Sequence, residues 1–262
     1  YFPDSGSVDM DDTSTNITDT TLDEMRQLAA RYPQPRSALL PMLHLVQSVD
    51  GRVSPAGIQA CAEVLGINCL TSVDDLPDGE VDLVFVCTPK SANLELLRAC
   101  AAKGITAAFV TSAGYGEADE AGIADEAELV AVCQELGILL AGPNGQGVVS
   151  TPANLCAQIV APYPPAGQIA IASQSGNFVS SFLNWSIATG VGISRAVSAG
   201  NAAATSVGDY LSFYASDSKT EVGLAYVEGI DNGREFFEQT RSVAAHLPLV
   251  VLKGGATDTG AR

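Results

Sequence analysis

The stretch QIAIASQSGNFVSSFL, residues 168–183, decides how the second half of this chain folds. It begins as an apolar run, changes to small polar residues at 173–177 and resumes as an amphipathic segment. An unbroken apolar run is typical of a strand buried on both faces of a parallel sheet, and the amphipathic segment predicts a helix over 177–189. The polar loop between them forms an ordinary strand-to-helix turn, a phosphate site at a helix N-terminus, or both, because the two interpretations do not exclude each other.

The same alternation of strand and helix recurs on both sides of this stretch. Apolar runs predict strands over 82–88, 105–111, 138–141, 168–173, 193–198, 222–228 and 248–253. Helices are predicted over 91–103, 125–136, 177–189, 205–215 and 233–245. The polar, Pro-rich segment 151–167 separates the two rounds, so the pattern predicts an α/β protein with two doubly wound parallel-sheet domains.

Residues 1–66 lack this alternation of predicted strands and helices. Residues 1–20 hold five acidic and no basic side chains, which predicts a disordered acidic tail. Residues 21–66 predict a small helical module. Its first helix opens with a capping box at 21–24, the second runs from about 36 to 48, and the third begins at Ser54-Pro55 and reaches Leu65. We therefore expect domains at 67–150 and 151–262 after this module.

Composition restricts the partners of the chain. Its 262 residues are 47% hydrophobic, and 30 acidic against 13 basic side chains give a net charge of −17. This charge argues against nucleic acid and anionic membranes, which attract clustered Lys and Arg. No apolar run reaches the roughly 18 residues of a membrane span, and the acidic N-terminus is unlike a signal peptide. We expect a cytoplasmic protein. The cysteines and histidines lack metal-site spacing, so no metal site is expected.

Ligands of parallel sheets bind beyond the carboxyl ends of the strands. The loops that follow the predicted strands are rich in glycine, amide and hydroxyl side chains, and they cover 88–90, 112–117, 142–147, 173–177, 198–201, 228–229 and 253–255. Loops 142–150 and 173–182 also contain no acidic residue, which favours the approach of an anion there.

Four stretches carry a family resemblance: AGPNGQGVVS (141–150), GQIAIASQSGNFVSSFLNWS (167–186), GVGISRAVSAGNAA (190–203), and LAYVEGIDNGREFF with PLVVLKGGAT (224–257). Residues 64–262 resemble the NDP-forming acyl-CoA synthetases, relatives of the α subunit of succinyl-CoA synthetase. The resemblance implies a truncated Rossmann-like CoA-binding domain and a flavodoxin-like succinyl-CoA-synthetase domain. In that family an acyl phosphate exchanges its phosphoryl group with a loop histidine, and CoA accepts the acyl group from the acyl phosphate with release of phosphate.

The resemblance also implies roles for single residues. Glu228 matches a catalytic glutamate that holds the phosphorylated histidine. The matched phosphate-binding loop is Ser173, Gln174, Ser175, Gly176 and Asn177. The matched CoA-binding residues are Thr88, Pro89, Gly142, Pro143 and Asn144. Asn201 and Lys253 are weaker candidates, and Tyr115 and Glu117 receive no role. CoA, with ATP or ADP and Mg²⁺ in the complete enzyme, is the implied cofactor set, and an ATP-grasp domain or subunit is the implied partner.

Two departures from the family pattern bear on activity. The family's histidine lies in a Ser-His-Thr-Gly stretch after the strand at 248–253, which the sequence to Arg262 does not reach, and His246 stands at the wrong motif position. We therefore expect this chain to be inactive alone. No Gly-rich turn for the ADP end of CoA precedes residue 66. Residues 22–67 instead resemble the helical start of the 24-kDa thioredoxin-like subunit of respiratory complex I, without its cysteine spacing, so no iron–sulfur cluster is expected.

We interpret the chain as the front part of an NDP-forming acid–CoA ligase that handles a small-molecule acyl-CoA. The alternative is a non-catalytic CoA-binding or assembly subunit that docks through residues 22–67, in the manner of a complex-I-like interaction module. A regulatory part of a lysine acetyltransferase is a third interpretation, although the sequence contains no acetyltransferase domain. The acid substrate and homo-oligomerisation stay open.

Overall fold

A computed structural model of the chain describes residues 15–159, 162–230 and 232–254. Most of the predicted acidic tail and residues 255–262 therefore lie outside the described residues. The chain divides into two compact units, Tyr1–Asp75 and Leu76–Arg262, and each is described by itself. No helix among the described residues is long and apolar enough to cross a membrane.

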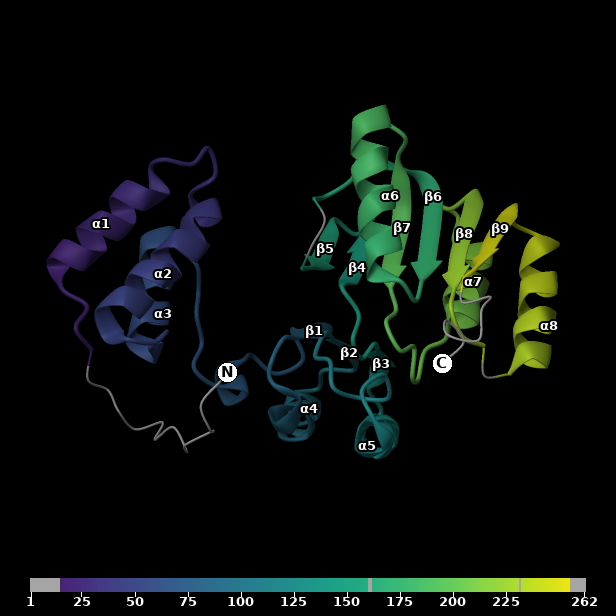
Figure 1. The fold of residues 1–262 in the computed structure, drawn as a ribbon, viewed down its shortest axis with the longest axis horizontal. Helices are drawn as coiled ribbons and strands as arrows, with labels where there is room; N and C mark the ends of the chain where they lie inside the picture. The colour runs from purple at the N-terminus through teal and green to yellow at the C-terminus, as the bar shows by residue number, and fades with distance from the viewer. Residues whose placement is uncertain (1–14, 160–161, 231, 255–262) are drawn as a thin grey trace. The chain divides into compact units, whose positions relative to one another are not determined.

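The first unit is a helical module with its own core (Figure 1). Its elements are α1 (Asp19–Ala29), η1 (Pro35–Ala38), α2 (Leu39–Asp50), α3 (Pro55–Leu65) and η2 (Val73–Asp75). Met25, Met42 and Val46 are fully buried where the three α-helices pack together. Helix α1 begins two residues before the predicted start, because its capping box joins Thr18 to Thr21 rather than spanning 21–24. The predicted bounds of α3 are confirmed.

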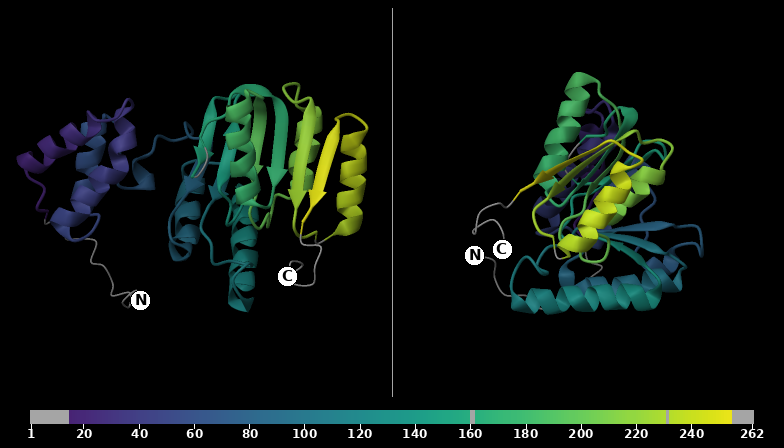
Figure 2. Two further views of the ribbon diagram at one scale, coloured as in Figure 1. Left: turned by 45° about the horizontal axis from the view of Figure 1, so that its top comes forward. Right: turned by 90° about the vertical axis from the view of Figure 1, so that its right-hand side faces the viewer.

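The second unit begins with a three-stranded parallel sheet in the order β1-β2-β3. Its elements are β1 (Leu83–Val86), η3 (Lys90–Ala92), α4 (Asn93–Ala102), β2 (Ala107–Val110), α5 (Glu120–Leu136) and β3 (Leu139–Ala141). Helices α4 and α5 pack on one face, where Leu97 and Leu129 meet Val110 and Leu140 (Figure 2). No strand precedes Leu83 among the described residues, so the strand and turn that open the family's domain have no counterpart there.

A six-stranded sheet follows in the order β5-β4-β7-β6-β8-β9. Its elements are β4 (Gly147–Ser150), β5 (Leu155–Gln158), β6 (Ala166–Ser173), α6 (Gly176–Thr189), β7 (Ile193–Ser198), α7 (Val207–Ser216), β8 (Val222–Val227), α8 (Gly233–Ala244) and β9 (Leu249–Lys253). Helix α6 covers the face that carries Ile171 and Ile193, whereas α7 and α8 cover the face that carries Ala170 and Ala172 (Figure 1). Strands β6 to β9 are parallel, as predicted.

Strands β4 and β5 form an antiparallel hairpin that the sequence reading missed. Strand β4 also pairs antiparallel with β7, so this sheet is mixed rather than wholly parallel. The expected boundary at residue 150 falls inside this hairpin. The two sheets also touch, because Phe109 of β2 packs into the core of the larger sheet and Thr205 Oγ1 donates to the carbonyl oxygen of Leu140 at 2.7 Å.

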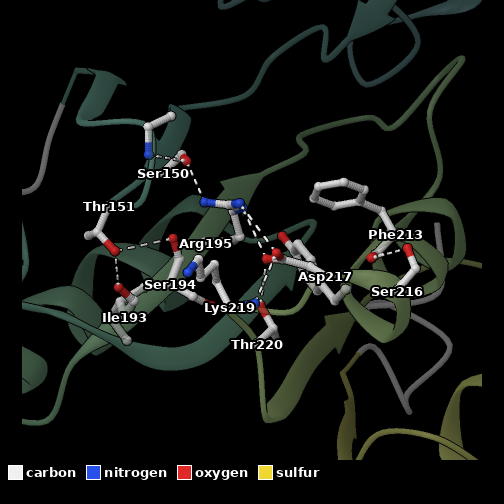
Figure 3. A network of polar contacts seen from close by, with 12 residues as sticks. Ser150, Thr151, Ile193, Ser194, Arg195, Phe213, Ser216, Asp217, Lys219 and Thr220 are labelled. Atoms are coloured by element: carbon white, nitrogen blue, oxygen red, sulfur yellow. Dashed lines mark hydrogen bonds and ion pairs between the residues drawn. The ribbon is translucent and has the colours of Figure 1, made fainter.

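A polar network ties the larger sheet together at the N-terminal half of β7 (Figure 3). The Arg195 guanidinium donates to Ser150 Oγ of β4 at 2.6 Å and forms an ion pair with Asp217, just after α7, at 3.3 Å. Thr151 Oγ1 donates to the carbonyl oxygen of Ile193 at 2.6 Å. These residues lie away from the carboxyl ends of the parallel strands, so the network supports the scaffold rather than the site.

Candidate functional site

The carboxyl ends of the strands bring the predicted loops into direct contact. The N–H of Ala199, after β7, donates to the carbonyl oxygen of Ser173 at 2.7 Å, and the N–H of Asn201 donates to that of Pro143 at 3.0 Å. Gly200 has a φ of +60°, and a Cβ at this position would overlap the backbone of residues 143–144. Because only glycine combines that conformation with so close an approach, the loops after β3, β6 and β7 form one surface.

The start of helix α6 has the features of an anion site. Ser175 Oγ caps the helix by accepting the N–H of Phe178 at 3.4 Å. Gly176 and Asn177 supply the first N–H groups of the helix, which have no intrahelical partner. No acidic residue lies in the first turn. The partial positive charge of the helix end is therefore directed at whatever approaches these two residues.

Ser173 and Gln174 hold the surrounding loops. Ser173 is fully buried, and its Oγ donates to the carbonyl oxygen of Ser175 at 2.9 Å while accepting the Ser175 N–H at 3.0 Å. Gln174 Oε1 accepts the N–H groups of Glu228 at 2.6 Å and Gly229 at 3.1 Å. Both side-chain oxygens are thus engaged with protein, and what the loop presents to a phosphate group is chiefly its backbone.

Glu228 lies at the end of β8 beside this loop. Lys253 Nζ, from the end of β9, donates to the Glu228 carbonyl oxygen at 2.8 Å. The Glu228 carboxylate itself is exposed, and among the described residues it has no hydrogen-bond or ion-pair partner. The two oxygen atoms of this carboxylate can therefore accept hydrogen bonds from an incoming N–H donor.

Asn93 organises the loop of Thr88 and Pro89, although the sequence reading did not single it out. Its side chain is fully buried. Asn93 Oδ1 accepts from Thr88 Oγ1 at 2.8 Å, and Nδ2 donates to Tyr115 Oη at 2.9 Å and to Ser112 Oγ at 3.2 Å. Burial raises the pKa of Tyr115, with the Asn93 hydrogen bond acting in the opposite direction. The loops after β1 and β2 are therefore fastened to each other.

Lys90 provides the cation nearest to this loop pair. Its Nζ donates to Asp125 at 2.5 Å and to the carbonyl oxygen of Gly114 at 2.7 Å. The hydrogen bond to Asp125 raises the pKa of Lys90, which burial opposes. Lys90 thus stays charged at neutral pH.

Gln146 is a second residue that the sequence reading missed. Its side chain crosses from the loop after β3 to the start of α6, where Oε1 accepts from Ser180 Oγ at 2.7 Å. A Cβ at Gly176 would overlap the Gln146 amide group. The Gln146 side chain therefore lies against the first turn of α6, the helix whose N-terminus has the features of an anion site.

A cavity of about 290 Å³ opens beside the same surface. Gln174, Asn201, Val227, Gly229 and Phe236 are among the residues that line it. The cavity lies next to the loop after β6 and between the starts of α7 and α8. The described residues contain no cluster of three or more His, Cys, Asp or Glu side chains suited to a metal ion.

Two family models match the chain. The family model for the CoA binding domain matches residues 37–151, and the model for the succinyl-CoA ligase like flavodoxin domain matches residues 166–262. The first of these matches begins earlier than the expected resemblance, within the helical module.

Relatives with named activities match the chain over most of its length. Acetate–CoA ligase [ADP-forming] I of Archaeoglobus fulgidus is 39% identical over 200 residues, which cover 76% of this chain and 29% of that protein. The α subunit of acetate–CoA ligase [ADP-forming] II of Pyrococcus furiosus is 33% identical over 219 residues, which cover 84% and 47%. A shorter match, 42% identical over 74 residues, is to a subunit of the NADH-quinone oxidoreductase of Mycobacterium bovis, and covers 25% and 29%.

A solved structure is also similar to this chain over most of its length. Dinucleotide forming acetyl-coenzyme A synthetase 1 of Ca. Korarchaeum cryptofilum, in complex with phosphate and ADP, superposes with a TM-score of 0.70 at 32% identity, covering 77% of this chain and 43% of that chain. The chain thus spans less than half the length of each ligase it matches. The chain therefore carries a CoA binding domain followed by a succinyl-CoA ligase like flavodoxin domain, and over these parts it is similar to ADP-forming acid–CoA ligases.

Proposed function

We propose that this chain supplies the CoA-binding and phosphate-binding part of an ADP-forming acid–CoA ligase. The observation that carries the proposal is the direct contact between the loop after β3 and the start of α6, made by Gln146. A thioester-forming ligase has to bring the CoA sulfur to a phosphorylated acid, and here the two predicted binding loops are in contact.

Each loop has a distinct task in this proposal. The N–H groups of Gly176 and Asn177 bind the phosphate group of the acyl phosphate and stabilise the negative charge that it keeps when it leaves. Residues 142–144 place the CoA sulfur for attack on the acyl carbon, and residues 88–89 bind the cofactor further from the sulfur. The exposed Glu228 carboxylate holds the histidine that is phosphorylated, as the family resemblance implies.

Three further features of the proposed enzyme stay predictions. They are the nucleotide with its Mg²⁺, an ATP-grasp domain or subunit, and a cytoplasmic location. Support for the nucleotide comes from the archaeal synthetase solved with phosphate and ADP. Support for a partner comes from the Pyrococcus relative, which is named as an α subunit.

Titration calorimetry of the full chain with CoA tests the proposal. We expect micromolar binding of CoA and of acetyl-CoA, and we expect inorganic phosphate to bind in a separate titration. A chain shown folded by circular dichroism that releases no heat up to millimolar CoA refutes the assignment of a CoA site.

A second candidate, an assembly subunit, is favoured by the surface of the first unit. Leu40 is 70% exposed and Val53 is 43% exposed, although both lie in or beside a well-packed helical module. Exposed apolar side chains mark a docking surface where they form a contiguous patch. Supplying the chain with a segment that carries the Ser-His-Thr-Gly loop and with an ATP-grasp ligase subunit separates the candidates, because only the ligase interpretation expects acetate-dependent ATP consumption.

A further inference from the structure

A polar bridge connects the loop after β2 and helix α5 with the loops after β3 and β7, and Asn201 is its centre. Asn201 Nδ2 donates to Glu117 Oε2 at 2.5 Å and to Glu126 Oε2 at 2.6 Å. Asn201 Oδ1 accepts from Asn144 Nδ2 at 3.2 Å. One side chain of the larger sheet therefore contacts three side chains, two of which belong to the domain of the smaller sheet.

The two glutamates in turn hold the backbone of their own loop. Glu117 Oε1 accepts the N–H groups of Gly114 at 2.5 Å and Tyr115 at 3.3 Å. Glu126 Oε2, from helix α5, accepts the N–H of Gly116 at 3.2 Å. Glu117 thus receives backbone donors at Oε1 and the Asn201 amide at Oε2, whereas Glu126 receives both the Gly116 N–H and the Asn201 amide at Oε2.

The charges of the bridge explain why an amide stands at its centre. Neither Glu117 nor Glu126 forms an ion pair with a Lys or Arg among the described residues. Neutral donors must therefore stabilise two neighbouring negative charges, and hydrogen bonds to charged acceptors are about twice as strong as neutral ones. Burial alone raises the pKa of Glu117, but the hydrogen bonds from Asn201 and Gly114 outweigh it and leave the pKa lowered.

The bridge ends on the loop that carries the CoA-binding assignment. Asn144 has a φ of +59°, its side chain is exposed, and its N–H donates to the carbonyl oxygen of Ser112 at 3.1 Å. Asn201 reaches the same residue from the other side through its side chain. Asn144 is thus held between the two domains rather than by its own loop alone.

We propose that Asn201 is a positioning residue for CoA, acting with Glu117 and Glu126 to set the place of loop 142–147. The inference rests on the proposed function for the identity of the ligand, but the bridge itself does not. Loss of the Asn201 amide releases Asn144 and leaves two carboxylates with fewer donors. The start of α6, which makes no contact with the bridge side chains, keeps its anion site.

The test compares Asn201→Ala and Asn201→Asp with the wild-type chain. Aspartate keeps the size of the side chain but adds a third carboxylate and removes both donors. A bridge of the proposed kind predicts CoA affinity in the order wild type, Ala, Asp, with at least a tenfold loss for Asp and unchanged binding of inorganic phosphate. If Asp behaves like wild type, only the shape of the side chain matters and the proposal is overturned.

Asn184→Ala serves as the matched control, because Asn184 is exposed and its amide donates only within its own helix, to Ser180. Hydrogen exchange at residues 114–116 and 142–147 is the second readout. It should accelerate in both Asn201 variants and stay unchanged in the control, whether or not CoA is present. Unchanged exchange in the Asn201 variants refutes the bridge. A wild-type chain that binds no CoA refutes the proposed function instead.

Discussion

Gly176→Ala should destabilise the second unit and weaken phosphate binding, because the added methyl group collides with Gln146. The new Cβ would lie 2.6 Å from Gln146 Cγ and closer still to its amide group, whereas carbon atoms in contact stay about 3.5–4.0 Å apart. The Gln146 side chain must therefore move and lose its 2.7 Å hydrogen bond with Ser180.

The magnitude follows from three contributions. Overpacking costs about 1–3 kcal/mol, and the lost hydrogen bond costs about 1 kcal/mol. Replacing glycine by alanine restricts the unfolded chain and returns about 0.4–1 kcal/mol. We expect a net loss of about 2 kcal/mol in the free energy of unfolding, together with weaker binding of inorganic phosphate by calorimetry.

Gly233→Ala is the control for this substitution. Gly233 is also the first residue of a helix, α8, but a Cβ there meets nothing within 4 Å, so alanine should stabilise by about 0.4–1 kcal/mol. The only tryptophan, Trp185, lies in α6, and its fluorescence reports guanidinium unfolding at the relevant place. Equal unfolding free energies for the two variants would refute the collision with Gln146.

Other predictions concern groups of the second unit. Asn93→Ala should lower the free energy of unfolding by about 3 kcal/mol, since three hydrogen bonds of about 1 kcal/mol each are lost; guanidinium unfolding measures this, and a loss below about 1 kcal/mol contradicts it. The folded pKa of Glu117 lies below its usual 4.5, so its stabilisation is complete above pH 4.5 and is lost as the pH falls through the folded pKa. Glu117→Gln should therefore flatten the acid side of the stability profile, and an unchanged profile speaks against the lowered pKa. Burial raises the pKa of Cys133 to about 11, so iodoacetamide should modify exposed Cys87 and Cys156 first. Mass spectrometry of the labelled peptides checks that order, which early labelling of Cys133 contradicts.

Elements with local signals were predictable. Strand β7 has the predicted bounds, and α3 has them because Ser54 and Pro55 mark its start. The hairpin of β4 and β5 was missed because β4 begins at the end of the glycine-rich loop 142–147 and β5 lies in the polar, Pro-rich segment 151–167. Its pairing with β7 depends on contacts that no local pattern encodes.

The same division applies to the site. Strand ends and glycine-rich loops indicated where ligands bind, because the carboxyl ends of parallel strands share one edge. Asn93 and Gln146 gave no such signal, since their partners Tyr115 and Ser180 lie 22 and 34 positions away in the sequence. Nothing in the sequence distinguishes a buried amide that joins two loops from any other polar residue near a turn.

The passage from one sheet to the other has a mechanical consequence. Strand β3 ends at Ala141 and β4 begins at Gly147, so residues 142–146 are the whole covalent connection between the two sheets at this point. A rotation of one domain against the other has to be absorbed by the backbone dihedral angles of this hinge. The hinge is also the loop assigned to the CoA sulfur. Domain rotation and the placement of the sulfur are therefore coupled, and a ligand that fixes one restrains the other.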